Sequence, residues 1–248
     1  MVDTPMPLTA HLAELRSRLI WCMVALAVGF IICYGFSDKI VAALQSPVAL
    51  VGQPVRVPLQ IIAPAEAFIT YIKVGLIAGL FLVLPFVLYQ LWQFVAPGLL
   101  EHEKKYTVPF LIGSAVLFYG GGVIFYLVLP FVVHFLLSFA KGDIKALLSV
   151  GYYVTFCVRL MIAFGLVFQL PMVVVFLTQL GLLSSRLLVK NFRHAVVLIF
   201  VVAAVLTPTT DPLSLVAMVL PMLLLYGLSI LAARGVELRQ ASRRAERY

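Results

Sequence analysis

The stretch from Tyr106 to Ala140 reads YTVPFLIGSAVLFYGGGVIFYLVLPFVVHFLLSFA and contains no Asp, Glu, Lys or Arg. A helix needs about 20 apolar residues to cross a hydrocarbon core of about 30 Å. This stretch is longer than that, so we expect it to lie in lipid rather than in water.

Five further stretches also lack charged residues and approach or exceed the length of about 20 residues that a span needs. The fifth of the six stretches in chain order is short. The composition agrees, since 63% of the residues are hydrophobic and 11% are charged, whereas soluble domains have about 25% charged residues. We therefore predict an all-α membrane protein with six transmembrane helices, in which residues 1–248 form a single polytopic domain. The expected spans are residues 19–37, 74–96, 110–136, 159–181, 194–208 and 213–232, followed by a basic cytoplasmic tail at 233–248.

The basic residues predict the orientation. Alternating loops place most Lys and Arg residues, among them Arg16, Lys104 and Arg186, on the side that carries both termini. By the positive-inside rule, this side is the cytoplasm. The formal net charge of +8 is then a topology signal and an attraction to anionic lipid headgroups. No nucleic-acid partner is expected, because no basic stripe interleaved with aromatic residues accompanies the charge.

Four of the expected spans contain a proline in their interior: Pro85, Pro130, Pro171 and Pro221. Each proline removes a backbone donor and bends its helix, and neighbouring helices must then satisfy the freed groups. This pattern favours a curved, cup-shaped bundle. The glycines at 120–122 allow helices to approach closely, either for packing within the chain or to present a concave surface to another membrane helix.

Catalytic chemistry has little support. The sequence lacks the P-loop, H-E-x-x-H and G-x-S-x-G motifs, and its four histidines lie in separate segments. We therefore predict that the protein is not an enzyme and has no catalytic residue, cofactor or metal site. The one strongly polar side chain deep in an expected span is Gln169, which either forms an interhelical hydrogen bond or contacts a guest polypeptide.

Two carboxylates, Glu14 and Glu103, lie near the expected cytoplasmic face among basic neighbours. Glu14 could form only an i,i+4 pair with Arg18, worth about 0.2 to 0.5 kcal/mol, and Glu103 could be a solvated loop charge. Together, however, two carboxylates at one interface could bind a pair of guanidinium groups, whose planar fork forms bidentate bonds that lysine cannot reproduce.

Over essentially its whole length, the chain resembles the TatC family. The resemblance is carried by HLAELRSRL (11–19), PAEAFITYIK (64–73), PFVLYQLWQFVAPGL (85–99), EKK (103–105), FGLVFQLP (164–171) and LTPTTD (206–211), in the order and context of that family.

The resemblance implies a function that the residues alone would not. It implies the core receptor of the twin-arginine translocase, which binds the twin-arginine signal peptide of folded cargo and organises the single-span partners TatA and TatB. Transport would be driven by the proton motive force across the cytoplasmic (inner) membrane of a bacterium. A homo-oligomer within a TatBC-type complex, surrounded by membrane lipids, is implied as well. Without the resemblance, a small multi-pass permease or secondary transporter is the alternative, although no charged residue lies near an expected bilayer midplane.

The resemblance also implies residue roles. Where the family often has a membrane-embedded Glu, this chain has Gln169, which can form hydrogen bonds but does not titrate. At the outer hairpin, Thr209 and Thr210 lengthen the usual T-P-x-D pattern. Signal-peptide binding is implied for Glu14, Arg16, Glu103 and Phe94, and partner contacts or structural roles for Pro47, Phe68, Pro85, Tyr126, Thr207, Pro208 and Asp211.

Overall fold

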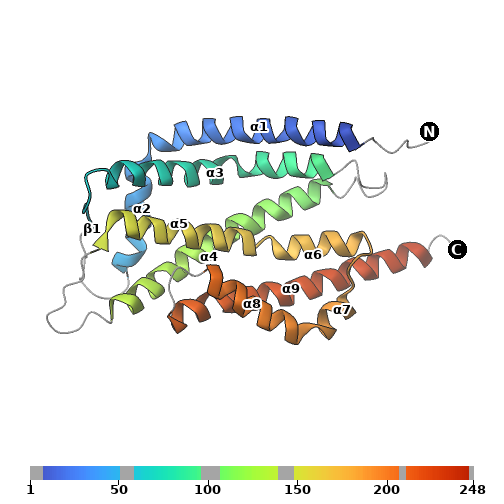
Figure 1. Cartoon of the computed structure of the whole chain (residues 1–248). Coiled ribbons are helices and arrows are strands. Elements are labelled where there is room, and N and C mark those ends of the chain that lie inside the picture. Colours follow the sequence, from blue (N-terminus) through green and yellow to red (C-terminus); the bar gives the residue numbers. More distant parts are fainter. Residues whose placement is uncertain (1–7, 51–58, 96–106, 139–147, 207–210, 246–248) are drawn as a thin grey trace. The chain divides into compact units, whose positions relative to one another are not determined.

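The protein is mostly helical in a computed structural model that describes residues 8–50, 59–95, 107–138, 148–206 and 211–245 (Figure 1). Two short strands pair in parallel, with Leu59 opposite Leu148 and Gln60 opposite Ser149. The elements are α1 (Leu8–Tyr34), α2 (Ser37–Leu50), β1 (Leu59–Gln60), α3 (Glu66–Val95), α4 (Thr107–Leu137), β2 (Leu148–Ser149), α5 (Val150–Val167), α6 (Leu170–Gln179), α7 (Ser185–Lys190), α8 (Phe192–Leu206) and α9 (Pro212–Ala245).

Several helices have the length and composition of membrane spans, as the uncharged stretches predict. Within the described ranges, five segments qualify: His11–Tyr34, Glu66–Phe94, Val108–Leu137, Val150–Gln179 and Pro212–Ala241. Helix α8 is apolar but shorter, and at 15 residues it extends over only about 22 Å at 1.5 Å per residue. The prediction of a mostly helical protein with several helices long and apolar enough to cross a membrane is therefore confirmed.

The chain divides into two compact units, each described here by itself. The first unit comprises Met1–Ala43 and Ile61–Ala115, and the second comprises Leu44–Gln60 and Val116–Tyr248. Helices α2 and α4 each contribute to both.

In the first unit, α1 and α3 run side by side in opposite directions (Figure 1). They approach closely at Gly29 and Gly79, where a Cβ atom on Gly29 would lie 2.8 Å from the Gly79 carbonyl oxygen. Helix α3 begins after a turn in which the Glu66 carboxylate accepts hydrogen bonds from the backbone N–H groups of Ile62 (2.6 Å) and Ala63 (3.1 Å). This carboxylate thus satisfies backbone donors in the turn that precedes α3.

In the second unit, α5 ends at Val167 and α6 begins at Leu170. The turn between them contains Gln169, and Pro171 lies in the first turn of α6, where its missing N–H is not needed. Gly121 of α4 packs against this region, because a Cβ atom there would lie 3.0 Å from the Phe164 carbonyl oxygen. One of the glycines at 120–122 therefore permits a close helix contact, as expected.

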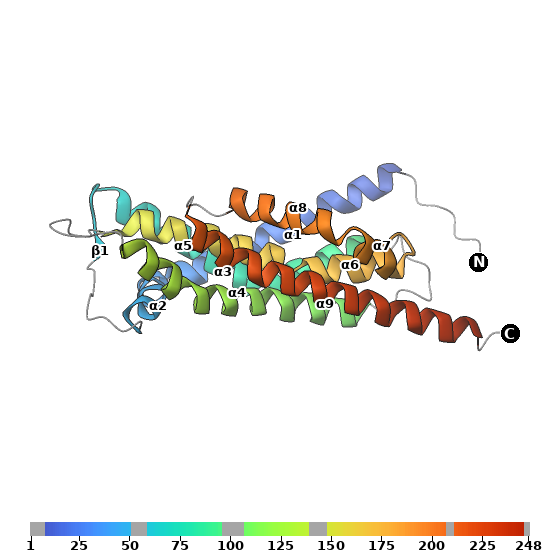
Figure 2. The ribbon, with the colours of Figure 1, turned by 90° about the horizontal axis from the view of Figure 1, so that it is seen from below.

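Helix α9 packs against α6, α7 and α8 (Figure 2). Near its C-terminal end, the Glu237 carboxylate accepts hydrogen bonds from the Ser185 backbone N–H (2.7 Å) and the Ser185 hydroxyl (2.5 Å). The Tyr226 hydroxyl donates to the Leu188 carbonyl oxygen at 2.9 Å. These bonds hold the short helix α7 against α9.

Candidate functional site

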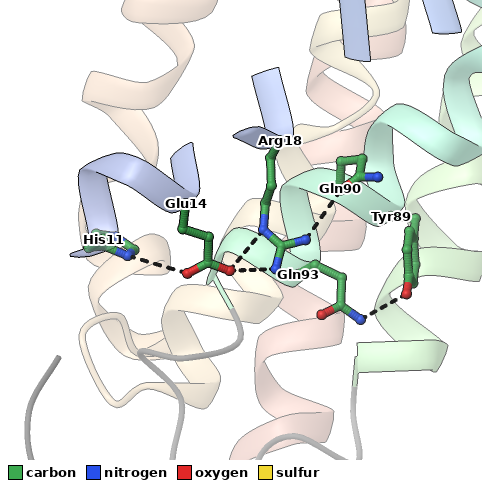
Figure 3. Close-up of polar contacts among 6 residues, drawn as sticks. All are labelled: His11, Glu14, Arg18, Tyr89, Gln90 and Gln93. Atoms are coloured by element: carbon green, nitrogen blue, oxygen red, sulfur yellow. Dashed lines mark hydrogen bonds and ion pairs between the residues drawn. The ribbon is translucent and has the colours of Figure 1, made fainter. Parts of the chain in front are cut away.

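The most developed polar contact in the first unit lies at the start of α1, around Glu14 (Figure 3). One carboxylate oxygen of Glu14, Oε1, accepts hydrogen bonds from Arg18 Nε (2.9 Å) and from Arg18 Nη2. The third nitrogen of the guanidinium, Nη1, donates to Gln90 Oε1 on α3 at 3.2 Å. Both side chains of the ion pair are 23% exposed, so the pair is partly screened by solvent rather than buried.

His11 joins this pair to a second predicted residue. His11 precedes Glu14 by about one helical turn, and its Nδ1 lies 4.0 Å from the other carboxylate oxygen of Glu14, Oε2. Its ring stacks on Phe94, with centroids 4.3 Å apart and planes inclined by 14°. Because α1 and α3 are antiparallel, the start of α1 meets the last turn of α3, and Glu14 and Phe94 become neighbours of the same histidine.

The last turns of α3 add further polar groups beside Glu14 (Figure 3). Gln93 Nε2 donates to the hydroxyl of Tyr89, the residue before Gln90, at 3.1 Å. The Glu14 carboxylate is thus contacted by Arg18 and His11 of α1, and α3 joins the cluster through the bond between Gln90 and Arg18. This arrangement is suited to hold a guanidinium group, because the Glu14 carboxylate and the Gln90 amide oxygen together accept hydrogen bonds from all three of its nitrogens.

Three other predicted residues of the first unit are exposed. Arg16 is exposed on α1, and Pro85 is exposed within α3. Phe68 lies near the start of α3 with 60% of its surface exposed. Glu103 lies outside the described residues, so its predicted partnership with Glu14 stays a prediction.

The predicted residues of the second unit have structural contacts. The amide-bearing residue Gln169 is half-buried at the α5–α6 turn. Tyr126 of α4 hydrogen-bonds through its hydroxyl to the Ser46 hydroxyl at 2.8 Å. Asp211 Oδ1 accepts from the Ser214 backbone N–H at 2.7 Å and thereby caps the start of α9. The side chain of Pro47 and residues Thr207 and Pro208 lie outside the described part of the structure.

Sequence reasoning anticipated the Glu14–Arg18 pair but assigned no role to His11 or Gln90. The spacing of His11, three residues before Glu14, is a local signal that could have indicated their contact. Gln90 is 72 positions from Arg18, and nothing local marks it. Among the described residues, no group of three His, Cys, Asp or Glu side chains could hold a metal ion.

Comparison with known proteins identifies the family. The family model described as "Sec-independent protein translocase protein (TatC)" matches residues 10–221. The chain belongs to the TatC family.

Individual TatC proteins match over nearly their whole length. The Sec-independent protein translocase protein TatC of Magnetococcus marinus is 40% identical over 98% of this chain and 90% of its own. The TatC protein of Koribacter versatilis is 38% identical over 95% of this chain and 88% of its own. The crystal structure of a twin-arginine translocase receptor TatC superposes with a TM-score of 0.78 at 34% identity, covering 92% of this chain and 99% of the other.

Family and fold together establish the general role. The chain is a multi-pass membrane component of the Tat protein translocase, and so it belongs to a transport family rather than to a family of catalytic enzymes.

Proposed function

We propose that this TatC-family chain is the receptor of the translocase, which binds the twin-arginine signal peptide of folded precursor proteins. The proposal also assigns it the task of organising TatA and TatB for export driven by the proton motive force. The family membership supports it, and the solved structure with the same fold is described as a twin-arginine translocase receptor.

One observation carries the proposal: the Glu14 carboxylate already binds a guanidinium group at the start of α1. A site that holds the Arg18 guanidinium through its Nε and Nη2 atoms has the geometry to hold the guanidinium of a signal arginine. Lysine would place one compact ammonium group there and could not reproduce the paired N–H directions. The contact therefore supports discrimination between paired arginines and paired lysines.

The remaining predicted residues complete this site in the proposal. Glu103 supplies the second carboxylate for the second arginine. Phe94, half-buried and stacked on His11, supplies apolar surface beside the carboxylate of Glu14. Arg16, exposed on the same helix, adds a polar contact to the signal peptide backbone or its carboxylates.

The proposed setting is the cytoplasmic membrane, with six crossings in a curved, cup-shaped bundle and both termini in the cytoplasm. In this arrangement α8 is the fifth crossing, and its limited length requires a locally thinned bilayer. The basic tail after Ala233 lies at the cytoplasmic face, where it is attracted to anionic headgroups. Homo-oligomers within a TatBC-type complex follow from the same proposal.

The test is a binding measurement with the full chain in lipid nanodiscs. A synthetic signal peptide with adjacent arginines is compared with the same peptide carrying adjacent lysines. Glu14→Gln and Glu103→Gln should each weaken binding of the arginine peptide by about 1.5 to 3 kcal/mol, the range for hydrogen bonds to charged groups, and should remove most of the preference for arginine.

Asp38→Asn is the matched control, because Asp38 is an exposed carboxylate on α2. It should leave both affinities unchanged. If both glutamate variants kept the wild-type preference for arginine, the proposed receptor site would be wrong.

A further inference from the structure

The guanidinium-binding oxygen of Glu14 is already occupied. Both Arg18 bonds to Glu14, from Nε and from Nη2, end on Oε1. Arg18 and Glu14 are one positive and one negative charge in direct contact, so together they offer an incoming cation no net charge. An arriving signal arginine therefore meets a site in which a guanidinium is already bound.

The second carboxylate oxygen does not offer an unobstructed alternative. Glu14 Oε2 faces His11 Nδ1 at 4.0 Å, and the His11 ring is held in place by its stack on Phe94. A guanidinium fork that binds both oxygens of a carboxylate needs Oε1 as well as Oε2. With His11 4.0 Å from Oε2 and Arg18 bonded to Oε1, an incoming fork that binds both oxygens competes with Arg18 for Oε1.

We propose that Arg18 competes with the signal arginine for the Glu14 carboxylate. The signal arginine displaces the Arg18 guanidinium on binding, and Arg18 returns to Glu14 when the signal leaves. This inference rests on the proposed function, since it concerns how the same carboxylate is occupied. Gln90 makes the exchange feasible, because its Oε1 accepts Arg18 Nη1 at 3.2 Å and can retain the displaced guanidinium beside α3.

The exchange has a specific thermodynamic consequence. Every ligand that displaces Arg18 must supply the same free energy to separate Arg18 from Glu14, whether its own cation is arginine or lysine. Arg18 therefore lowers the affinity of the site for paired arginines and for paired lysines by the same factor and leaves their ratio unchanged. It also shortens the lifetime of the bound signal, because its return to Glu14 favours release. A residue that merely oriented Glu14 would have the opposite effect, since its loss would weaken binding.

The experiment titrates arginine and lysine signal peptides into the full chain in nanodiscs, with variants Arg18→Gln and Arg18→Lys. Arg18→Gln should tighten binding of both peptides by about 2- to 5-fold, the range for removing a partly exposed ion pair, with an unchanged arginine-to-lysine ratio. Arg18→Lys keeps the positive charge but lacks the fork, so it should tighten both affinities by a smaller factor.

Arg193→Gln is the matched control, because it removes one positive charge from an exposed position at the start of α8. It should leave both affinities unchanged. If Arg18→Gln weakened binding, Arg18 would be a positioning residue and the exchange would be wrong. If Arg18→Lys bound like the wild type while Arg18→Gln bound more tightly, simple charge repulsion would replace the exchange.

The Glu14→Gln background separates this inference from the proposed function. If Glu14→Gln binds like the wild type, the receptor site itself is wrong. If Glu14→Gln loses binding while Arg18→Gln fails to tighten it, the receptor site stands and the exchange falls. In the double variant, Arg18→Gln should add no affinity to Glu14→Gln, because no carboxylate is left for Arg18 to occupy.

Discussion

Gly79 of α3 lies against Gly29 of α1 so closely that a Cβ atom on Gly79 would stand 2.7 Å from the Gly29 carbonyl carbon and 2.6 Å from the Phe30 nitrogen. Both neighbours are backbone atoms, which cannot rotate away as a side chain can. This contact sets how α1 lies on α3 and thereby places Arg18 next to Gln90.

Gly79→Ala should push α1 away from α3. Overpacking of this kind costs about 1 to 3 kcal/mol, and thermal unfolding of the purified chain in detergent should show the loss. Gly227→Ala is the control, because a Cβ atom at Gly227 in α9 has no neighbour within 4 Å and alanine favours a helix by about 0.5 to 1 kcal/mol. Equal stability of the two variants would contradict the proposed close contact.

The adjacent residues Tyr152 and Tyr153 should respond differently to loss of their hydroxyl groups. Tyr153 is 5% exposed, and its hydroxyl donates to the Leu44 carbonyl oxygen of α2 at 2.6 Å. Tyr153→Phe should therefore lower the free energy of unfolding by about 1 kcal/mol, the net value of an intramolecular hydrogen bond.

Tyr152 is 81% exposed, so Tyr152→Phe should change stability by less than about 0.5 kcal/mol. Denaturant unfolding monitored by helical circular dichroism checks both values. If the two substitutions had equal effects, the buried hydrogen bond would contribute nothing measurable.

Gln169 at the α5–α6 turn should affect transport more than folding. If the amide contacts a polar cavity or a guest polypeptide, Gln169→Leu removes that contact while preserving volume, and export should fall with little change in thermal stability. Gln169→Glu should be tolerated where water reaches the site, because a solvated carboxylate can ionise without a large desolvation cost.

A cysteine at position 169 tests access directly, after replacement of Cys22, Cys33 and Cys157. A water-soluble maleimide should label it, whereas a cysteine at Leu166, an apolar position with 61% exposure one turn earlier, should stay unlabelled in lipid. Absence of labelling at 169, together with wild-type export by Gln169→Leu, would leave only a helix-packing role.

The hairpin between α8 and α9 is the expected docking edge for a partner's single apolar helix. Cysteines at Leu206, Thr209 and Leu213 should form disulfides with the outer end of a TatB or TatA helix, because a polar group near that end needs a partner such as Asp211. Leu117 of α4 is the control position. Crosslinks from Leu117 at the same yield would show that the hairpin is not the docking edge.

Some of this structure was predictable because its causes are local in the chain. The uncharged stretch at Tyr106–Ala140 is long enough to cross a bilayer whatever its neighbours are, and the structure has α4 there. The Glu14–Arg18 contact follows likewise from helix geometry, since residues four apart lie on one face.

Other features required the assembled helices. The Ser185–Glu237 contact links positions 52 apart and has no counterpart in any local pattern. Such contacts depend on which helices pack together.

Hydrophobic length and charge spacing by themselves determined that the chain is a helical membrane protein with a carboxylate near the start of its first helix. These properties depend on the free energy of transferring each segment into lipid, which is a sum over neighbouring residues. Only the tertiary structure decided that His11 stacks on Phe94 and that Gln90 receives Arg18. Those contacts depend on the antiparallel register of α1 and α3, which is set by interhelical packing at Gly29 and Gly79 rather than by any property of the separate segments.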